Sequence, residues 1–190
     1  MKPYISVDIE GVAGITDWSE ATPTDGACPA FQHLMTQETL AACQGALAAG
    51  ATEIFVKDAH WFGRNLKSED LPAEVTLIRG WSGSPLFMVQ ELDNSFTGAA
   101  FIGWHARAGS EGNPLAHTGT TKINEIRLNG EPMSEFGLHV RMANALGVPV
   151  VFISGDEEIC AEAHQYNAHI QTCPLLRGIG ASTVYAGPHL

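Results

Sequence analysis

The sequence has few charged residues, and basic residues are the scarcest. Only 16% of its 190 residues are charged, against about 25% in a typical protein. The 10 lysines and arginines are outnumbered by 21 aspartates and glutamates, which gives a net charge of −11. A chain this acidic is repelled by phosphate backbones and by anionic lipid headgroups. The composition therefore argues against nucleic acid or a membrane surface as a partner.

Cysteine is also scarce, and long apolar runs are missing. The four cysteines form no C-x-x-C pair and lie far apart, which excludes a zinc-finger spacing and a dense disulfide framework. We expect them to be buried, small apolar groups. No apolar run approaches the roughly 18 residues of a membrane span, and Asp8 comes too early for a signal peptide. These absences favour a cytoplasmic protein. The cysteines are Cys28, Cys43, Cys160 and Cys173.

Short apolar runs alternate with helical patterns along the chain. Continuously apolar runs predict strands buried on both faces of a parallel sheet, and the segments between them carry helix caps and helix formers. The alternation predicts an α/β fold with a mostly parallel central sheet and helices on both faces. The expected strands are 5–9, 53–56, 98–103 and 148–153; the expected helices are 36–49, 84–92, 135–146 and 156–166; the expected loops are 18–29 and 106–121.

Metal-capable side chains stand at the ends of three successive predicted strands. Asp8 and Glu10 follow the first, His60 the second and His105 the third, while Glu135 opens a predicted helix. The carboxyl ends of parallel strands meet at one edge, where open α/β sheets bind ligands. Two imidazoles and three carboxylates suit zinc and could also suit manganese, cobalt or iron. Five ligands exceed what one structural zinc takes, and a carboxylate bridging two metals would account for the surplus.

Each of these residues also has an ordinary explanation. A lone acidic residue at a strand end is usually solvated, and a lone histidine there is more often a packed or rim residue. Their repetition at three strands favours the metal site. His117, in a loop rich in Gly and Thr, could act as acid, base or oxyanion partner, or could be a plain surface histidine. We expect no role for the remaining histidines, which are His33, His139, His164, His169 and His189.

Five short motifs occur in the order seen in one family. They are Ser-Val-Asp-Ile-Glu-Gly at 6–11, Lys-Asp-Ala-His at 57–60, Gly-Trp-His-Ala-Arg-Ala at 103–108, the loop histidine at 117 and Ser-Glu-Phe-Gly-Leu at 134–138. A Gly-Asp pair at 155–156 follows the last strand. Together they resemble the zinc-dependent D-aminopeptidase family, peptidase family M55. The resemblance extends from residue 4 to about 160.

The resemblance implies a metallo-aminopeptidase with two zinc ions per chain. The family's metal ligands fall on Asp8, Glu10, His60, His105 and Glu135, with Asp8 bridging the metals, and its catalytic histidine falls on His117. The implied reaction removes N-terminal D-amino acids from short peptides with a water that the two zinc ions activate. The alternatives are another di-metal amidohydrolase, an L-specific peptidase, or a fragment that binds metal or peptide without turnover.

Two residues near the predicted histidine ligands have more than one possible role. Asp58 could orient His60 or bind the substrate ammonium, and Arg107 could bind a substrate carboxylate or neutralise the acidic site.

The domain assignment follows the same resemblance. Residues 1–170 form the expected catalytic, metal-binding α/β domain, and residues 171–190 read as an irregular tail that stands for a shortened C-terminal region. The family assembles into stacked rings, so a ring-shaped homo-oligomer is the implied state.

Overall fold

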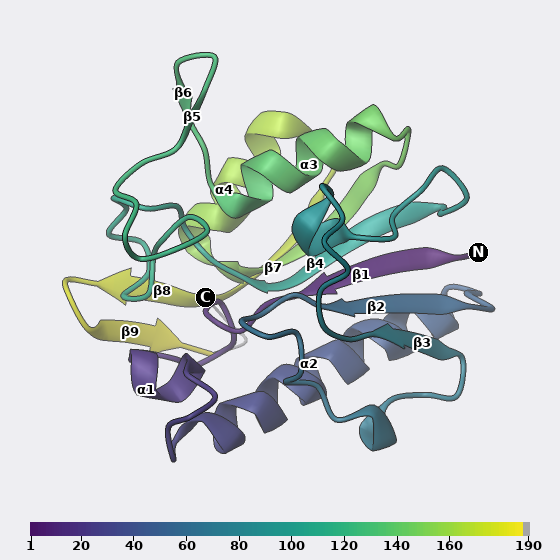
Figure 1. Cartoon of the computed structure of the whole chain (residues 1–190), viewed down its shortest axis with the longest axis horizontal. Coiled ribbons are helices and arrows are strands. Elements are labelled where there is room, and N and C mark those ends of the chain that lie inside the picture. The colour runs from purple at the N-terminus through teal and green to yellow at the C-terminus, as the bar shows by residue number, and fades with distance from the viewer. Residues whose placement is uncertain (188–190) are drawn as a thin grey trace.

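The computed structural model describes residues 1–187, which form a mixed α/β fold (Figure 1). The strands are β1 (Pro3–Val7), β2 (Ile54–Asp58), β3 (Val75–Ile78), β4 (Gly98–Trp104), β5 (Arg127–Leu128), β6 (Glu131–Pro132), β7 (Val150–Asp156), β8 (Gln171–Ile179) and β9 (Thr183–Ala186). The helices are α1 (Trp18–Ala21), α2 (Cys28–Ala48), α3 (Glu135–Ala145) and α4 (Glu157–Tyr166), with 3-10 turns η1 (Ser68–Asp70) and η2 (Phe87–Val89).

Seven of the strands form the central sheet, in the order β3-β2-β1-β4-β7-β8-β9. Every neighbouring pair is parallel except β8 and β9. The short strands β5 and β6 pair with each other in a hairpin that projects from the body (Figure 1). Because β2, β1 and β4 are parallel neighbours, the segments that follow them leave the sheet at the same edge. The mostly parallel α/β fold expected from the sequence is confirmed.

Helices cover both faces of the sheet, as expected. In Figure 1, α3 and α4 lie on one face and α2 lies on the other. Successive side chains of a strand point to opposite faces, so Phe101 of β4 joins the core under α3 and α4 while Ile102 joins the core under α2. The apolar runs of the sequence are thus used on both sides of the sheet.

The predicted helices agree with the observed helices to different extents. Ser134 caps α3 by accepting from the backbone N–H of Gly137, and Asp156 caps α4 by accepting from that of Ile159. The helix expected at 36–49 begins eight residues earlier, with a proline in its first turn, a position that proline tolerates. The prediction of a helix at 84–92 is wrong. Only the 3-10 turn η2 forms there, because Phe87 has a left-handed backbone with φ of 50°.

The irregular tail expected at 171–190 is also wrong over most of its length. Residues 171–179 form β8 beside β7, and 183–186 form β9. Cys173-Pro174 occurs within β8, and the Gly-rich stretch 178–180 lies at the end of β8 and in the β8–β9 turn. These Gly and Pro residues therefore belong to a strand and to the turn after it, and they do not mark a lack of structure. Residues 188–190, which include His189, lie outside the described residues.

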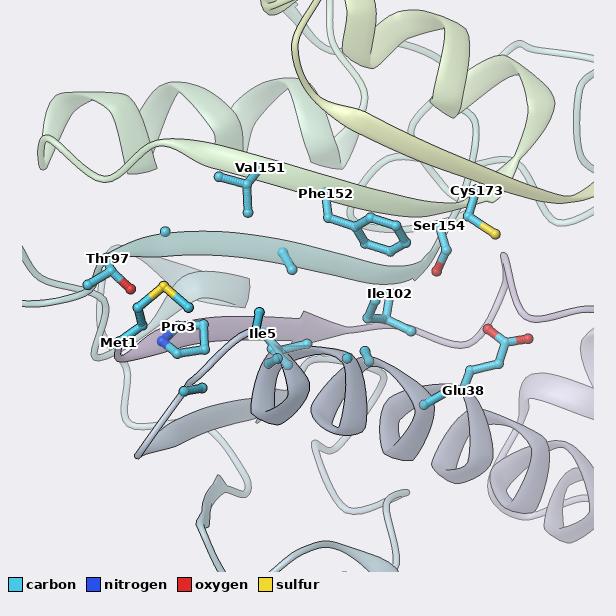
Figure 2. A pocket seen from close by; sticks show the side chains of 18 of the residues that line it. Met1, Pro3, Ile5, Glu38, Thr97, Ile102, Val151, Phe152, Ser154 and Cys173 are labelled. Atoms are coloured by element: carbon cyan, nitrogen blue, oxygen red, sulfur yellow. The ribbon is translucent and has the colours of Figure 1, made fainter.

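An apolar groove remains on the α2 face of the sheet. It has a volume of about 620 Å³ and is lined by small residues of α2 and by side chains of the β1–β4–β7–β8 part of the sheet. Figure 2 shows Glu38, Ser154 and Cys173 at one end and Met1 and Thr97 at the other. Parallel sheets are usually covered on both faces, yet Val151 of the interior strand β7 is 47% exposed here.

Two expectations about the rest of the chain can be compared with the structure. All four cysteines are free, and three are buried, whereas Cys173 is half-buried. Within residues 1–187, no helix combines the length and apolar character that crossing a bilayer requires.

Candidate metal centre

The polar side chains predicted at the sheet edge meet in one place. Asp8 and Glu10 follow β1, His60 follows β2, His105 follows β4, and Glu135 is the first residue of α3. All five are at most 5% exposed. They line a pocket of about 450 Å³, apart from His105, whose Nε2 lies beside the carboxylates of Asp8 and Glu135.

Asp8 stands between the two histidines. Its Oδ1 lies 3.2 Å from Nδ1 of His60, and its Oδ2 lies 3.6 Å from Nε2 of His105. Glu10 Oε2 is 3.1 Å from the same nitrogen of His60, and Glu135 Oε2 is 3.4 Å from the same nitrogen of His105. The five residues thus divide into two groups that share Asp8, each with one imidazole.

Both imidazoles are oriented by the backbone. The Nε2 of His60 is 2.7 Å from the carbonyl oxygen of Ala21, and the Nδ1 of His105 is 2.9 Å from that of Ala106. A carbonyl only accepts, so each of these nitrogens carries a proton, and the opposite nitrogen, which faces the carboxylates, is the one that can exchange its proton for a metal ion. Metal-bound histidines are typically anchored in this way.

In the described part of the chain, the carboxylates of the centre have only histidines as ion-pair partners. Within residues 1–187, no lysine or arginine pairs with these three carboxylates. Burial, with the charge of Glu10 adding to it, raises the pKa of Asp8 to about 7. Burial opposes charge on His105 as well, but the surrounding carboxylates, Glu135 first, outweigh it and raise its pKa to about 10. Protons on the imidazoles compensate the carboxylates, and a metal ion can take the place of such protons.

The donor set fits zinc. Ligands on a tetrahedral zinc with bonds near 2.0–2.1 Å lie roughly 3.3 Å apart, and the carboxylate–imidazole distances here are 3.1 to 3.6 Å. In addition, Nε2 of His105 is buried without a hydrogen-bond partner in the described structure. Two sets of ligand atoms lie within 4.8 Å of one another: those of Asp8, Glu10 and His105, and those of His105, His117 and Glu135.

His117 reaches the centre from the loop after β4. Its ring stacks on His105 with centroids 4.4 Å apart, and its Nε2 is 3.5 Å from Glu135 Oε1. The loop is fixed rather than free. Thr118 bonds to both Ala108 and Met133, and the N–H of Gly119 donates to Glu135 at 2.6 Å. This position brings His117 within reach of anything bound between the two groups.

Asp58 is occupied by its own loop. Its carboxylate accepts from the backbone N–H groups of Asn65 and Leu66 and from the side chain of Asn65, which in turn donates to the carbonyl of His60. Asp58 is not one of the pocket-lining residues in the described part of the chain. Arg107 donates to the Ala108 carbonyl and is not among the described residues that line the pocket.

The backbone packs closely behind His105. A Cβ at Gly11 or at Gly155 would collide with the carbonyl of Trp104, so both glycines are needed for β1, β4 and β7 to meet here. Asp156 accepts from the N–H of Ala106 at 2.6 Å and from Asn113. These contacts hold the segment that carries His105.

Sequence reasoning missed the pocket walls. Trp18 packs edge-on against His117 with ring centroids 5.3 Å apart, and four exposed aromatic residues line the β2–β3 side of the pocket. His139, expected to have no role, is buried and donates to the carbonyl of Glu135 at 2.6 Å. The one feature of the sequence that could have indicated these walls is the aromatic pair Trp61-Phe62 directly after His60.

The comparison with protein families decides the family. A family model for peptidase family M55, described as D-aminopeptidase, matches residues 1–189. The chain belongs to this family. It is 33% identical over 184 residues to the D-aminopeptidase of Bacillus subtilis (strain 168), which covers 97% of this chain. The chain spans 66% of the length of that M55 relative.

A solved structure of the M55 family agrees with the fold. It is the zinc-dependent D-aminopeptidase DppA from Bacillus subtilis, described as a self-compartmentalizing protease. The TM-score is 0.93 at 32% identity, and the match covers 98% of this chain and 68% of that one.

Proposed function

We propose that the protein is a zinc-dependent aminopeptidase that removes N-terminal D-amino acids from short peptides. The observation that carries the proposal is the buried nitrogen and oxygen donor set at the sheet edge, with Asp8 shared between two imidazoles. Membership of the D-aminopeptidase family and likeness to a zinc-dependent relative support the metal and the reaction.

Five residues would hold two zinc ions. We assign Asp8, Glu10 and His60 to one position and Asp8, His105 and Glu135 to the other, with one oxygen of Asp8 facing each group. Bound zinc supplies Lewis acidity, which polarises the scissile carbonyl and lowers the pKa of the attacking water. Glu135 begins α3, and the helix dipole favours its negative charge there.

His117 is the proposed catalytic residue. Its Nδ1 is 3.0 Å from the Leu115 carbonyl, so Nε2 is the nitrogen directed toward the centre. When that nitrogen is protonated, it can donate to the leaving amine or stabilise oxyanion charge. Trp18 and Glu135 fix the ring in the pocket. Because Asp58 is engaged by its own loop, Glu10 is the carboxylate available to a substrate ammonium, and a zinc ion would instead bind the N-terminus as the neutral amine.

The metal assignment is tested by metal content. Protein purified without chelator should contain about two zinc ions per chain, and His60→Ala should retain fewer than the exposed-histidine control His33→Ala. A zinc content near zero that added zinc does not restore would contradict the proposal.

The reaction is tested with matched peptides. The zinc-loaded protein should hydrolyse D-alanyl-glycine and leave L-alanyl-glycine largely intact. Loss of a general acid or base typically reduces the rate 10²- to 10⁴-fold, so we expect about that loss of kcat in His117→Ala with zinc content retained and His33→Ala unaffected. Preference for the L-peptide would instead identify an L-specific peptidase, and peptide binding without turnover a binding protein.

We also propose that copies of the chain assemble into a ring-shaped homo-oligomer in the cytoplasm. The description of the relative as self-compartmentalizing supports the assembly. Light scattering coupled to size exclusion should give a mass many times 20.3 kDa, whereas a monomer would contradict it.

A further inference from the structure

Exposed aromatic side chains gather at one wall of the metal pocket. Five aromatic residues are exposed in the described part of the chain, and four of them line this pocket, at 38 to 59% exposure. We call these four the aromatic wall. They are Trp61, Phe62, Trp81 and Phe87. An exposed apolar cluster of this kind marks a binding surface, and its place in the pocket points to a ligand of the metal centre.

The aromatic wall is held in place before any ligand binds. The Lys57 ammonium lies 4.0 Å from the centroid of the Trp81 ring and donates to two backbone carbonyls. The indole N–H of Trp81 donates to the Trp61 carbonyl at 2.8 Å, and Phe87 stacks on the ring at 5.2 Å. A preorganised apolar surface binds a side chain without a large ordering cost.

The backbone of the wall is strained in order to present two of the rings. Trp61 and Phe87 both have φ of 50°, a left-handed conformation that bulky residues rarely adopt. Such conformations persist where the surroundings enforce them, and they cluster at ligand sites.

The wall meets the centre at His60, whereas His117 meets it at His105. The ring of Trp61 is 6.1 Å from that of His60, which faces Oδ1 of Asp8. His117 stacks on His105, which faces Oδ2. If His117 donates to the leaving amine, the leaving group lies beside His117. The N-terminal residue of the peptide then lies on the His60 side, with its side chain toward the aromatic wall.

We infer that the aromatic wall is a subsite for a large apolar side chain on the N-terminal D-residue of the peptide. This inference rests on the proposed function. Peptides that begin with D-phenylalanine or D-leucine are then better substrates than peptides that begin with D-alanine. Burying a side chain of that size in place of a methyl group increases affinity roughly 10- to 100-fold.

The test compares kcat/KM for D-phenylalanyl-glycine, D-alanyl-glycine and D-alanyl-D-phenylalanine. The zinc-loaded wild type should prefer D-phenylalanyl-glycine over D-alanyl-glycine by at least 10-fold. Trp81→Ala and Phe62→Ala should reduce that ratio, mainly through KM, and Trp81→Phe should restore most of it. The control Tyr185→Ala truncates an equally exposed aromatic residue outside the pocket and should keep the wild-type ratio.

Several results would overturn the subsite. The first is an equal kcat/KM for the D-phenylalanyl and D-alanyl peptides, and the second is a preference for phenylalanine at the second residue of the peptide. The third is an equal loss of kcat/KM on all peptides in Trp81→Ala. The last is a Trp81→Ala variant whose oligomer mass changes while its selectivity stays that of the wild type.

Failure of the proposed function is a separate result, in which the wild type cleaves none of the peptides. In that case, calorimetry that compares the binding of D-phenylalaninamide and D-alaninamide tests the subsite. Tighter binding of the phenyl compound that Trp81→Ala abolishes supports the subsite, and equal binding rejects it.

Discussion

Glu38 provides a sharp test of the burial described for the α2 face. Its Oε1 accepts from the N–H of Ala13 at 2.9 Å, while its Oε2 is buried without a hydrogen-bond partner in the described structure. Burial raises the pKa of this carboxyl from 4.5 to about 7. The folded protein therefore holds a proton that the unfolded chain has already lost between these pH values. Stability contributed by the neutral group is lost as the pH rises through this window.

The magnitude follows from the two pKa values. One pKa unit corresponds to about 1.4 kcal/mol, so ionised Glu38 lowers the free energy of unfolding by roughly 3 kcal/mol above pH 7. Glutamine is uncharged and can accept the same N–H. We expect Glu38→Gln to stabilise the protein, with a gain that is about 2.5 kcal/mol larger at pH 8 than at pH 5.

Urea unfolding followed by circular dichroism measures this difference. Both proteins are unfolded at pH 5 and pH 8 in the presence of EDTA, so that protonation of the metal ligands is common to both and cancels in the comparison. The exposed control Glu74→Gln should change stability little at either pH. A gain from Glu38→Gln that is equal at both pH values would refute the reasoning. So would a wild type that is more stable than the Glu38→Gln variant at pH 8.

Three further substitutions test other parts of the structure. Phe101→Ala removes a fully buried ring packed edge-on against Trp104 and Phe136; it should cost about 3–5 kcal/mol in urea unfolding, and a cost below 1 kcal/mol would contradict the packing. Gly155→Ala places a Cβ against the Trp104 carbonyl and should cost at least about 2 kcal/mol by the same assay, whereas Gly147→Ala, where no atom is near, tests the left-handed backbone alone. Asp58→Ala leaves two backbone N–H groups of the His60 loop without their acceptor; zinc affinity measured by chelator competition should fall about 10-fold, and unchanged affinity would show that the loop holds His60 unaided.

The sequence was most informative where the local pattern and the tertiary structure impose the same requirement. The apolar runs that became β1, β2 and β4 are largely buried on both faces, and that of β7 is buried except where Val151 opens to the groove, so their composition alone identifies them. The same topology brings the residues after β1, β2 and β4 to one edge, which is why Asp8, His60 and His105 could be grouped from their positions in the chain.

Where the prediction failed, long-range contacts decide the structure. The Ser84-Pro85 pair is a sound helix start by local rules, but Phe87 takes a left-handed backbone as it stacks on Trp81, and the helix does not propagate. The strand β8 contains proline and half-exposed side chains, and it is a strand because β7 pairs with it. The position of the aromatic wall depends on how the β2–β3 and β3–β4 connections fold, which no local pattern encodes.

The uncovered groove beside α2 affects how the folding of this protein can be monitored. Fluorescent dyes such as ANS respond to accessible apolar surface, and their binding is commonly taken as a sign of a loosened, molten state. Here the native fold itself offers a groove of about 620 Å³ lined mainly by apolar side chains. A high dye signal at low temperature is thus a property of the folded chain. Near-ultraviolet circular dichroism, to which the buried Trp104 of the opposite core contributes, needs no added dye and reports the loss of tertiary packing without that interference.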